Sequence, residues 1–140
     1  MFYGAIALTV ISNVLYHILQ KSIPGGVNPV FSLIVVYVVA AAASLLLLPL
    51  FPLQAGFAEE LRKVNWASIG LGAVIVGLEL GFLLAYRAGW NISLASLVSN
   101  TTVALLLVPV GLLLFKEHIT PVNTVGIVLA LAGLVLVNWK

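Results

Sequence analysis

Five apolar runs, each about as long as a bilayer is thick, set the architecture of this chain. A helix needs about 20 apolar residues to cross the hydrocarbon core. Five segments meet this requirement, near residues 2–20, 29–51, 66–86, 93–115 and 121–139. Lipid offers the backbone no hydrogen-bond partners, so each run is expected to form a transmembrane helix. The prediction is an all-α membrane protein with five transmembrane helices in a single domain, residues 1–140.

The composition excludes most soluble classes of protein. Hydrophobic residues make up 63% of the chain and charged residues 7%, whereas a soluble domain carries about 25% charged residues. The net charge of +2 comes from scattered basic residues and argues against a nucleic-acid partner. There is no cysteine, and no nucleophile–base pair, metal motif or phosphate loop is visible. We therefore expect no enzyme activity, cofactor or metal.

The basic residues divide evenly between the two predicted membrane faces. They are Arg62, Lys63 and Lys116 on one face and Lys21, Arg87 and Lys140 on the other. The Lys/Arg bias that normally fixes orientation is therefore absent. Either one orientation wins for reasons outside this count, or the chain inserts both ways and pairs antiparallel. Because five helices is an odd number, two such chains would form an inverted repeat, an architecture that many transporters use.

Glu79 is the one acidic residue inside a predicted span. Placing a carboxylate there costs roughly 2.5 kcal/mol or more, so it should face a cavity or a partner rather than lipid. Such a group suits the exchange of a proton for a cation, although a hydrogen-bonded structural acid is the alternative. Tyr86 lies on the same predicted helix face, where an aromatic ring would attract a cation.

Polar side chains on two other predicted helices complete the candidate site. The first helix carries a polar stripe at spacings of three and four residues, which includes Asn13, Tyr16, His17 and Gln20. On the fourth helix, Ser96 and Asn100 align at i and i+4. The predicted proton-coupling and substrate-binding residues are Asn13, Tyr16, His17, Glu79, Tyr86, Ser96 and Asn100. Interhelical hydrogen bonding without any role in transport is the alternative for the groups on the fourth helix, and an interfacial or satisfied histidine near a helix end is the alternative for His17. Arg87 is expected simply to reach the lipid headgroups from a span end.

Small residues mark candidate packing faces. Gly77 and Gly81 belong to a four-residue repeat on the third predicted helix, on the side opposite Glu79. The fifth helix carries Gly126, Ala130 and Gly133, which we interpret as positions for helix packing or dimer contact.

The second half of the chain combines a small and polar run at residues 88–96, Pro109, the turn from Phe115 to Thr120, and Gly126 and Gly133. In these features it resembles the EamA-type unit of the drug/metabolite transporter superfamily. Within the turn, Thr120 and Pro121 also form a recognisable helix start. More remotely, the chain is similar to the small multidrug resistance proteins, although their acidic residue in the first helix has no counterpart here.

The resemblance implies a transporter and an export direction. Typical members of the superfamily contain two such units in inverted orientation, so a single unit is expected to act as one half of an inverted-repeat transporter, completed by dimerisation. The expected activity is export of small organic solutes, cationic or amine-bearing, by an antiparallel homodimer, with proton antiport through Glu79. The expected location is a prokaryotic cytoplasmic (inner) membrane. A uniporter of neutral metabolites or amino acids, and a non-transporting accessory membrane subunit, are the alternatives.

Overall fold

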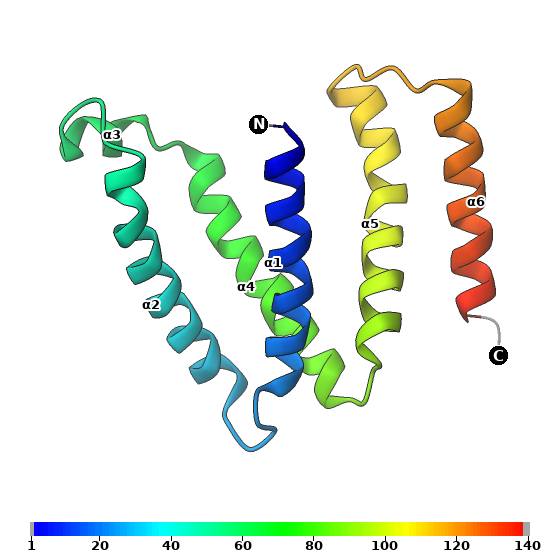
Figure 1. Ribbon diagram of the computed structural model, residues 1–140, viewed down its shortest axis with the longest axis horizontal. Coiled ribbons are helices and arrows are strands. Elements are labelled where there is room, and N and C mark those ends of the chain that lie inside the picture. Colours follow the sequence, from blue (N-terminus) through cyan, green and yellow to red (C-terminus); the bar gives the residue numbers. More distant parts are fainter. Residues whose placement is uncertain (1, 139–140) are drawn as a thin grey trace. The chain divides into compact units, whose positions relative to one another are not determined.

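The chain is all-helical in the computed structural model, which describes residues 2–138. The predicted end of the last helix at residue 139 lies outside the described residues. Figure 1 shows the elements: α1 (Phe2–Ser22), α2 (Pro29–Leu47), the 3-10 helix η1 (Leu48–Leu50), α3 (Phe57–Lys63), α4 (Trp66–Arg87), α5 (Ile92–Leu114) and α6 (Pro121–Asn138). No strand occurs between residues 2 and 138, so the predicted all-α class is confirmed.

Four helices are long and apolar enough to cross a membrane: α1, α2 with its extension η1, α4 and α5. The fifth apolar segment, α6, is shorter, with 18 residues. At a rise of about 1.5 Å per residue it is roughly 27 Å long, just under the thickness of the hydrocarbon core. Four of the five predicted spans therefore meet the length and composition expected of a transmembrane helix, and the fifth stays a prediction.

Most large apolar side chains on these helices are exposed. The buried apolar residues between positions 3 and 137 are Leu33, Leu83, Tyr86 and Ala95. In contrast, side chains such as Leu46 remain 81% exposed. A soluble domain would bury such side chains. Outward apolar surface along membrane-length helices instead fits contact with lipid.

Side-chain caps fix where several helices begin. The Asn28 side chain accepts hydrogen bonds from two backbone amides of α2, at 2.9 and 3.1 Å, and Pro29 follows at the first helical position. Asn65 caps α4 in the same way, at 3.0 and 3.4 Å. The Thr120 hydroxyl accepts from the backbone amide of Asn123 at 3.2 Å, which confirms the predicted start of α6.

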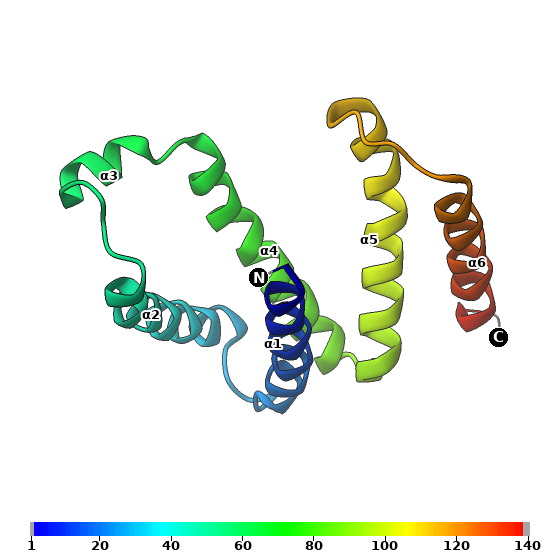
Figure 2. The ribbon, with the colours of Figure 1, turned by 45° about the horizontal axis from the view of Figure 1, so that its top comes forward.

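The chain forms two compact units. The first unit contains the residues up to His17 and those from Gly89 onward, and the second unit runs from Ile18 to Ala88. In the first unit, α5 and α6 pack side by side and run in opposite directions (Figures 1 and 2). In the second unit, α2 packs against α4 and is linked to it through η1 and α3.

A tight turn ends α5. The backbone amides of Phe115 and Glu117 both donate to the carbonyl oxygen of Gly111, at 3.2 and 3.0 Å. Lys116 between them adopts a φ of 52°, in the left-handed region that closes many helices. The Glu117 side chain folds back over Gly111, where an added Cβ would overlap its carboxylate. A glycine at position 111 thus gives the turn room to fold back onto α5.

The caps predict a difference between two asparagines that precede helices. Asn65→Ala should lower the free energy of unfolding by about 1 kcal/mol, because two backbone amides of α4 lose their acceptor. Asn91 precedes α5 but makes no side-chain capping bond, so Asn91→Ala is the matched control and should change stability by only a few tenths of a kcal/mol. Denaturant titration in detergent, followed by circular dichroism, measures both. Equal losses would show that the Asn65 cap contributes nothing specific.

Candidate functional site

Glu79 is held by an amide from another helix of the second unit. Nε2 of Gln20, near the end of α1, donates to the Glu79 carboxylate oxygen Oε2 at 2.9 Å. The same nitrogen donates to the Glu79 backbone carbonyl, also at 2.9 Å. Gln20 is only 4% exposed. The acid that sequence reasoning singled out therefore has a buried hydrogen-bond donor, as a carboxyl group in an apolar segment requires.

Tyr37 brings α2 to the same acid. Its hydroxyl is buried and finds no hydrogen-bond partner among the described residues, and the tyrosine interacts electrostatically with Glu79. Glu79 of α4 thus interacts with groups from α1 and α2 within the second unit.

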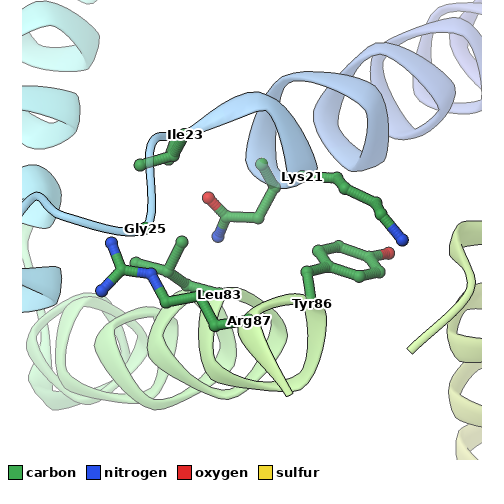
Figure 3. A pocket seen from close by; sticks show the side chains of 7 residues that line it. Lys21, Ile23, Gly25, Leu83, Tyr86 and Arg87 are labelled. Atoms are coloured by element: carbon green, nitrogen blue, oxygen red, sulfur yellow. The ribbon is translucent and has the colours of Figure 1, made fainter. Parts of the chain in front are cut away.

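A pocket of about 360 Å³ lies one to two helical turns from Glu79 along α4 (Figure 3). It is lined by Gln20, Lys21, Ile23, Gly25, Leu83, Tyr86 and Arg87. Leu83 and Tyr86 are buried in its wall, at 1% and 6% exposure. They follow Glu79 by four and seven residues on the same helix, so all three share one face. The predicted placement of Glu79 and Tyr86 on a common face of α4 fits this arrangement.

Lys21 covers the aromatic ring in that wall. Its ammonium nitrogen lies 5.7 Å from the centroid of the Tyr86 ring, within the range of a cation–π interaction. The rings of Tyr86 and Phe82 also stack, with centroids 6.1 Å apart. Figure 3 shows the Lys21 side chain extending to Tyr86 on one side of the pocket, with Arg87 near Gly25 on the other.

Arg87 binds the loop between α1 and α2. Its Nη2 atom donates to the carbonyl oxygens of Pro24 at 3.2 Å and Val27 at 2.8 Å. Its Nε atom is buried and has no hydrogen-bond partner among residues 3–137. Arg87 therefore also holds the loop after α1, through one guanidinium nitrogen, and its expected contact with lipid headgroups stays a prediction.

The first unit holds a second pocket, of about 320 Å³, without charged residues. Thr9, Val10, Asn13 and Val14 of α1 and Asn100 of α5 line it. Nδ2 of Asn100 donates to the Ser96 hydroxyl at 3.3 Å, so the expected alignment of these two residues is confirmed. Asn13 and Asn100 place hydrogen-bonding amides at a common cavity, which suits a neutral polar group.

His17 and Tyr16 form a separate aromatic contact on α1. Their ring centroids are 5.1 Å apart and the rings meet edge to face, at 73°. His17 is buried, with 3% exposure. A role for this pair in binding stays a prediction.

The predicted site residues fall into two groups. Glu79 and Tyr86 belong to the second unit, whereas Asn13, Tyr16, His17, Ser96 and Asn100 belong to the first. Sequence reasoning missed Gln20 and Lys21 as site residues. Gln20 continues the polar stripe of the first helix, and that periodicity was the available signal. Lys21 had no such signal, because its contact with Tyr86 joins residues far apart in the sequence.

The predicted small packing positions face open space in the described chain. A Cβ built at Gly77, Gly81, Gly126 or Gly133 meets no atom within 4 Å, and Ala130 is exposed. Contact of these faces with another chain stays a prediction.

The surface helix α3 carries a pair of opposite charges. On α3 the Lys63 ammonium donates to Glu60 Oε1 at 2.7 Å, and this hydrogen bond holds the pKa of Glu60 below its usual value. Among the described residues, no group of three or more His, Cys, Asp or Glu side chains is placed to hold a metal ion.

Comparison with known proteins gives one match. The model of the EamA-like transporter family matches residues 2–139, nearly the whole chain. No curated protein matches, and no solved structure matches.

The Arg87 contacts predict how the loop behaves when they are lost. Arg87→Gln should speed hydrogen exchange of the backbone amides between Ile23 and Asn28 by about tenfold, because two charge-assisted hydrogen bonds to the loop disappear. Arg62→Gln removes an exposed guanidinium from α3 and serves as the matched control, with no change expected in this loop. Exchange measured by mass spectrometry in lipid nanodiscs compares the two. An unchanged loop in Arg87→Gln would show that the side chain does not hold it.

Proposed function

The chain belongs to the EamA-like transporter family and is therefore an integral membrane transporter, and from this premise we propose that it exports small cationic or amine-bearing organic solutes in exchange for protons. Glu79 carries the exchange, and Tyr86 contributes an aromatic surface for the cation. The proposal adds the solute class, the coupling ion and the direction to what family membership establishes.

The hydrogen bond between Gln20 and Glu79 is the observation that supports proton exchange most strongly. An ionised carboxylate only accepts hydrogen bonds, and Gln20 Nε2 donates to it at 2.9 Å. A protonated carboxyl group also donates, and the amide oxygen of the same glutamine is an acceptor. Because a carboxamide has both functions, Gln20 is able to satisfy Glu79 in either protonation state. An apolar neighbour would leave the ionised form without a donor.

Competition at Glu79 links the proton to the solute. A cation near the carboxylate favours its ionised form, and protonation removes the charge that attracts the cation. The two ligands therefore displace each other, which is the requirement for antiport. Alternating exposure of such a site to the two sides of the membrane would convert this competition into coupled movement.

A partner chain completes the transporter in this proposal, and we assign this role to an identical chain in antiparallel orientation. The even division of basic residues supports insertion in both orientations, because neither face carries the Lys/Arg excess that would select one. The open faces at Gly81 and Gly126 leave room for close helix approach by the partner. The proposed location is a prokaryotic cytoplasmic membrane.

One observation favours a second candidate function. The pocket of the first unit is lined by Thr9, Asn13, Asn100 and two valines, with no charged residue. Amide and hydroxyl groups in an uncharged cavity fit neutral metabolites or amino acids. A uniporter of such solutes would use Glu79 only as a structural acid, and its flux would not depend on pH.

Replacement of Glu79 tests proton coupling. In proteoliposomes that contain a trapped pH dye, an imposed choline gradient should drive proton movement through the wild-type protein. Glu79→Gln should abolish this movement while the protein stays folded, because the amide cannot release a proton. Glu60→Gln, on the surface helix α3, is the matched control and should retain coupling. Wild-type proton movement in Glu79→Gln would remove Glu79 from the mechanism.

Reporter fusions test the antiparallel homodimer. A pair of C-terminal reporters, one active only in the cytoplasm and one only outside it, should both give signal, because the chain inserts in both orientations. A variant with added lysines in the loop between η1 and α3 should shift the signal toward one reporter, because one face of the membrane then carries an excess of basic residues. Signal from a single reporter in the unaltered chain would exclude the antiparallel homodimer.

A further inference from the structure

The ammonium group of Lys21 already occupies the surface on which a solute cation would bind. It lies 5.7 Å from the centroid of the Tyr86 ring, and both residues line the pocket of about 360 Å³. Figure 3 shows the lysine side chain reaching over to the tyrosine. Phe82 stacks on the same tyrosine at 6.1 Å, so the ring has an aromatic neighbour and a cation at once.

The two basic residues of the pocket differ in their surroundings. The Arg87 guanidinium donates to the carbonyls of Pro24 and Val27, which fixes it to the loop. Lys21 is exposed and sits in the last turn of α1. A long lysine side chain in that place has other favourable positions, at the carbonyl end of its helix or among lipid headgroups. Lys21 therefore has positions outside the pocket that would uncover the ring.

We propose that Lys21 is a specificity-determining residue, whose ammonium group competes with a solute cation for the face of Tyr86. This inference rests on the proposed function, since it assumes that the pocket receives a cationic solute. A solute binds there only when its own cation–π interaction replaces the one made by Lys21. Cations that the Tyr86 ring attracts only weakly are excluded. Solutes with several cationic groups, or with further aromatic contacts, are bound.

The magnitude of the competition follows from the strength of the contact. A cation–π interaction at an accessible site contributes about 0.5–1 kcal/mol. Removing the competing ammonium should therefore tighten the binding of a cation by about two- to fivefold. A neutral molecule of the same shape makes no cation–π interaction, so its binding should not change.

Choline and its uncharged isostere 3,3-dimethylbutan-1-ol provide the probes. Binding is measured by calorimetry in nanodiscs of uncharged lipid, at constant pH and without any gradient. We expect Lys21→Gln to bind choline about two- to fivefold more tightly than the wild type and to leave binding of the isostere unchanged. Lys21→Arg keeps the cation and should behave like the wild type.

Changes at Tyr86 show whether the ring is responsible. In the Lys21→Gln background, Tyr86→Phe preserves an aromatic face and should keep most of the gain. Tyr86→Leu should lose it. Circular dichroism of each variant checks that the helices persist, and Tyr86→Phe keeps the comparison informative if the leucine variant does not fold.

Two results would overturn the inference. One is equal choline affinity in the wild type and Lys21→Gln, including the absence of saturable binding in both. The other is an equal gain for choline and for its isostere, which would indicate a wider pocket rather than a lost competitor. Because these are equilibrium measurements, they are separate from proton coupling. Failure of the Glu79→Gln test would leave a choline-specific gain in Lys21→Gln intact. Absence of that gain would leave proton coupling through Glu79 intact.

Discussion

The medium around the helices offers no hydrogen bonds, and this constraint governs the structure from the backbone outward. Within a span, each amide and carbonyl is paired inside its own helix, which explains why every element between residues 2 and 138 is helical. The unpaired groups are left at helix ends. Asn28 and Asn65 accept from first-turn amides, and Arg87 donates to carbonyls of the loop after α1. Polar side chains therefore cluster where the backbone needs them.

The same constraint explains the pairing of Gln20 with Glu79. A carboxyl group at this depth must have a polar neighbour, and α1 supplies the side-chain amide of Gln20. An amide can hydrogen-bond to a carboxyl group in either protonation state. The basic residue next in the chain, Lys21, contacts the Tyr86 ring. The local arrangement therefore keeps an acid, an amide and a cation close together in one unit.

The sequence predicted the helices well, because length, apolar composition and capping residues are local properties. Thr120 and Pro121 marked the start of α6 correctly, and the polar periodicity of α1 predicted the face that bears Gln20. Contact partners were harder to predict. The sequence placed Arg87 at a span end, but the carbonyls that it binds belong to a loop 60 and 63 residues earlier. Small residues at Gly77 and Gly81 suggested packing, yet the opposite face of α4, with Leu83 and Tyr86, is the one buried in this chain. Periodicity identifies a face but does not identify its partner.

Charge separates the two pockets more clearly than size does. The pocket of the second unit contains Lys21 and Arg87, with Glu79 one turn beyond its wall, and the pocket of the first unit is uncharged. Electrostatic interactions in apolar surroundings are strong and depend on protonation, whereas hydrogen bonds to Asn13 and Asn100 change little with pH. The proposed ion coupling therefore draws on groups of the second unit, and the second candidate function draws on groups of the first.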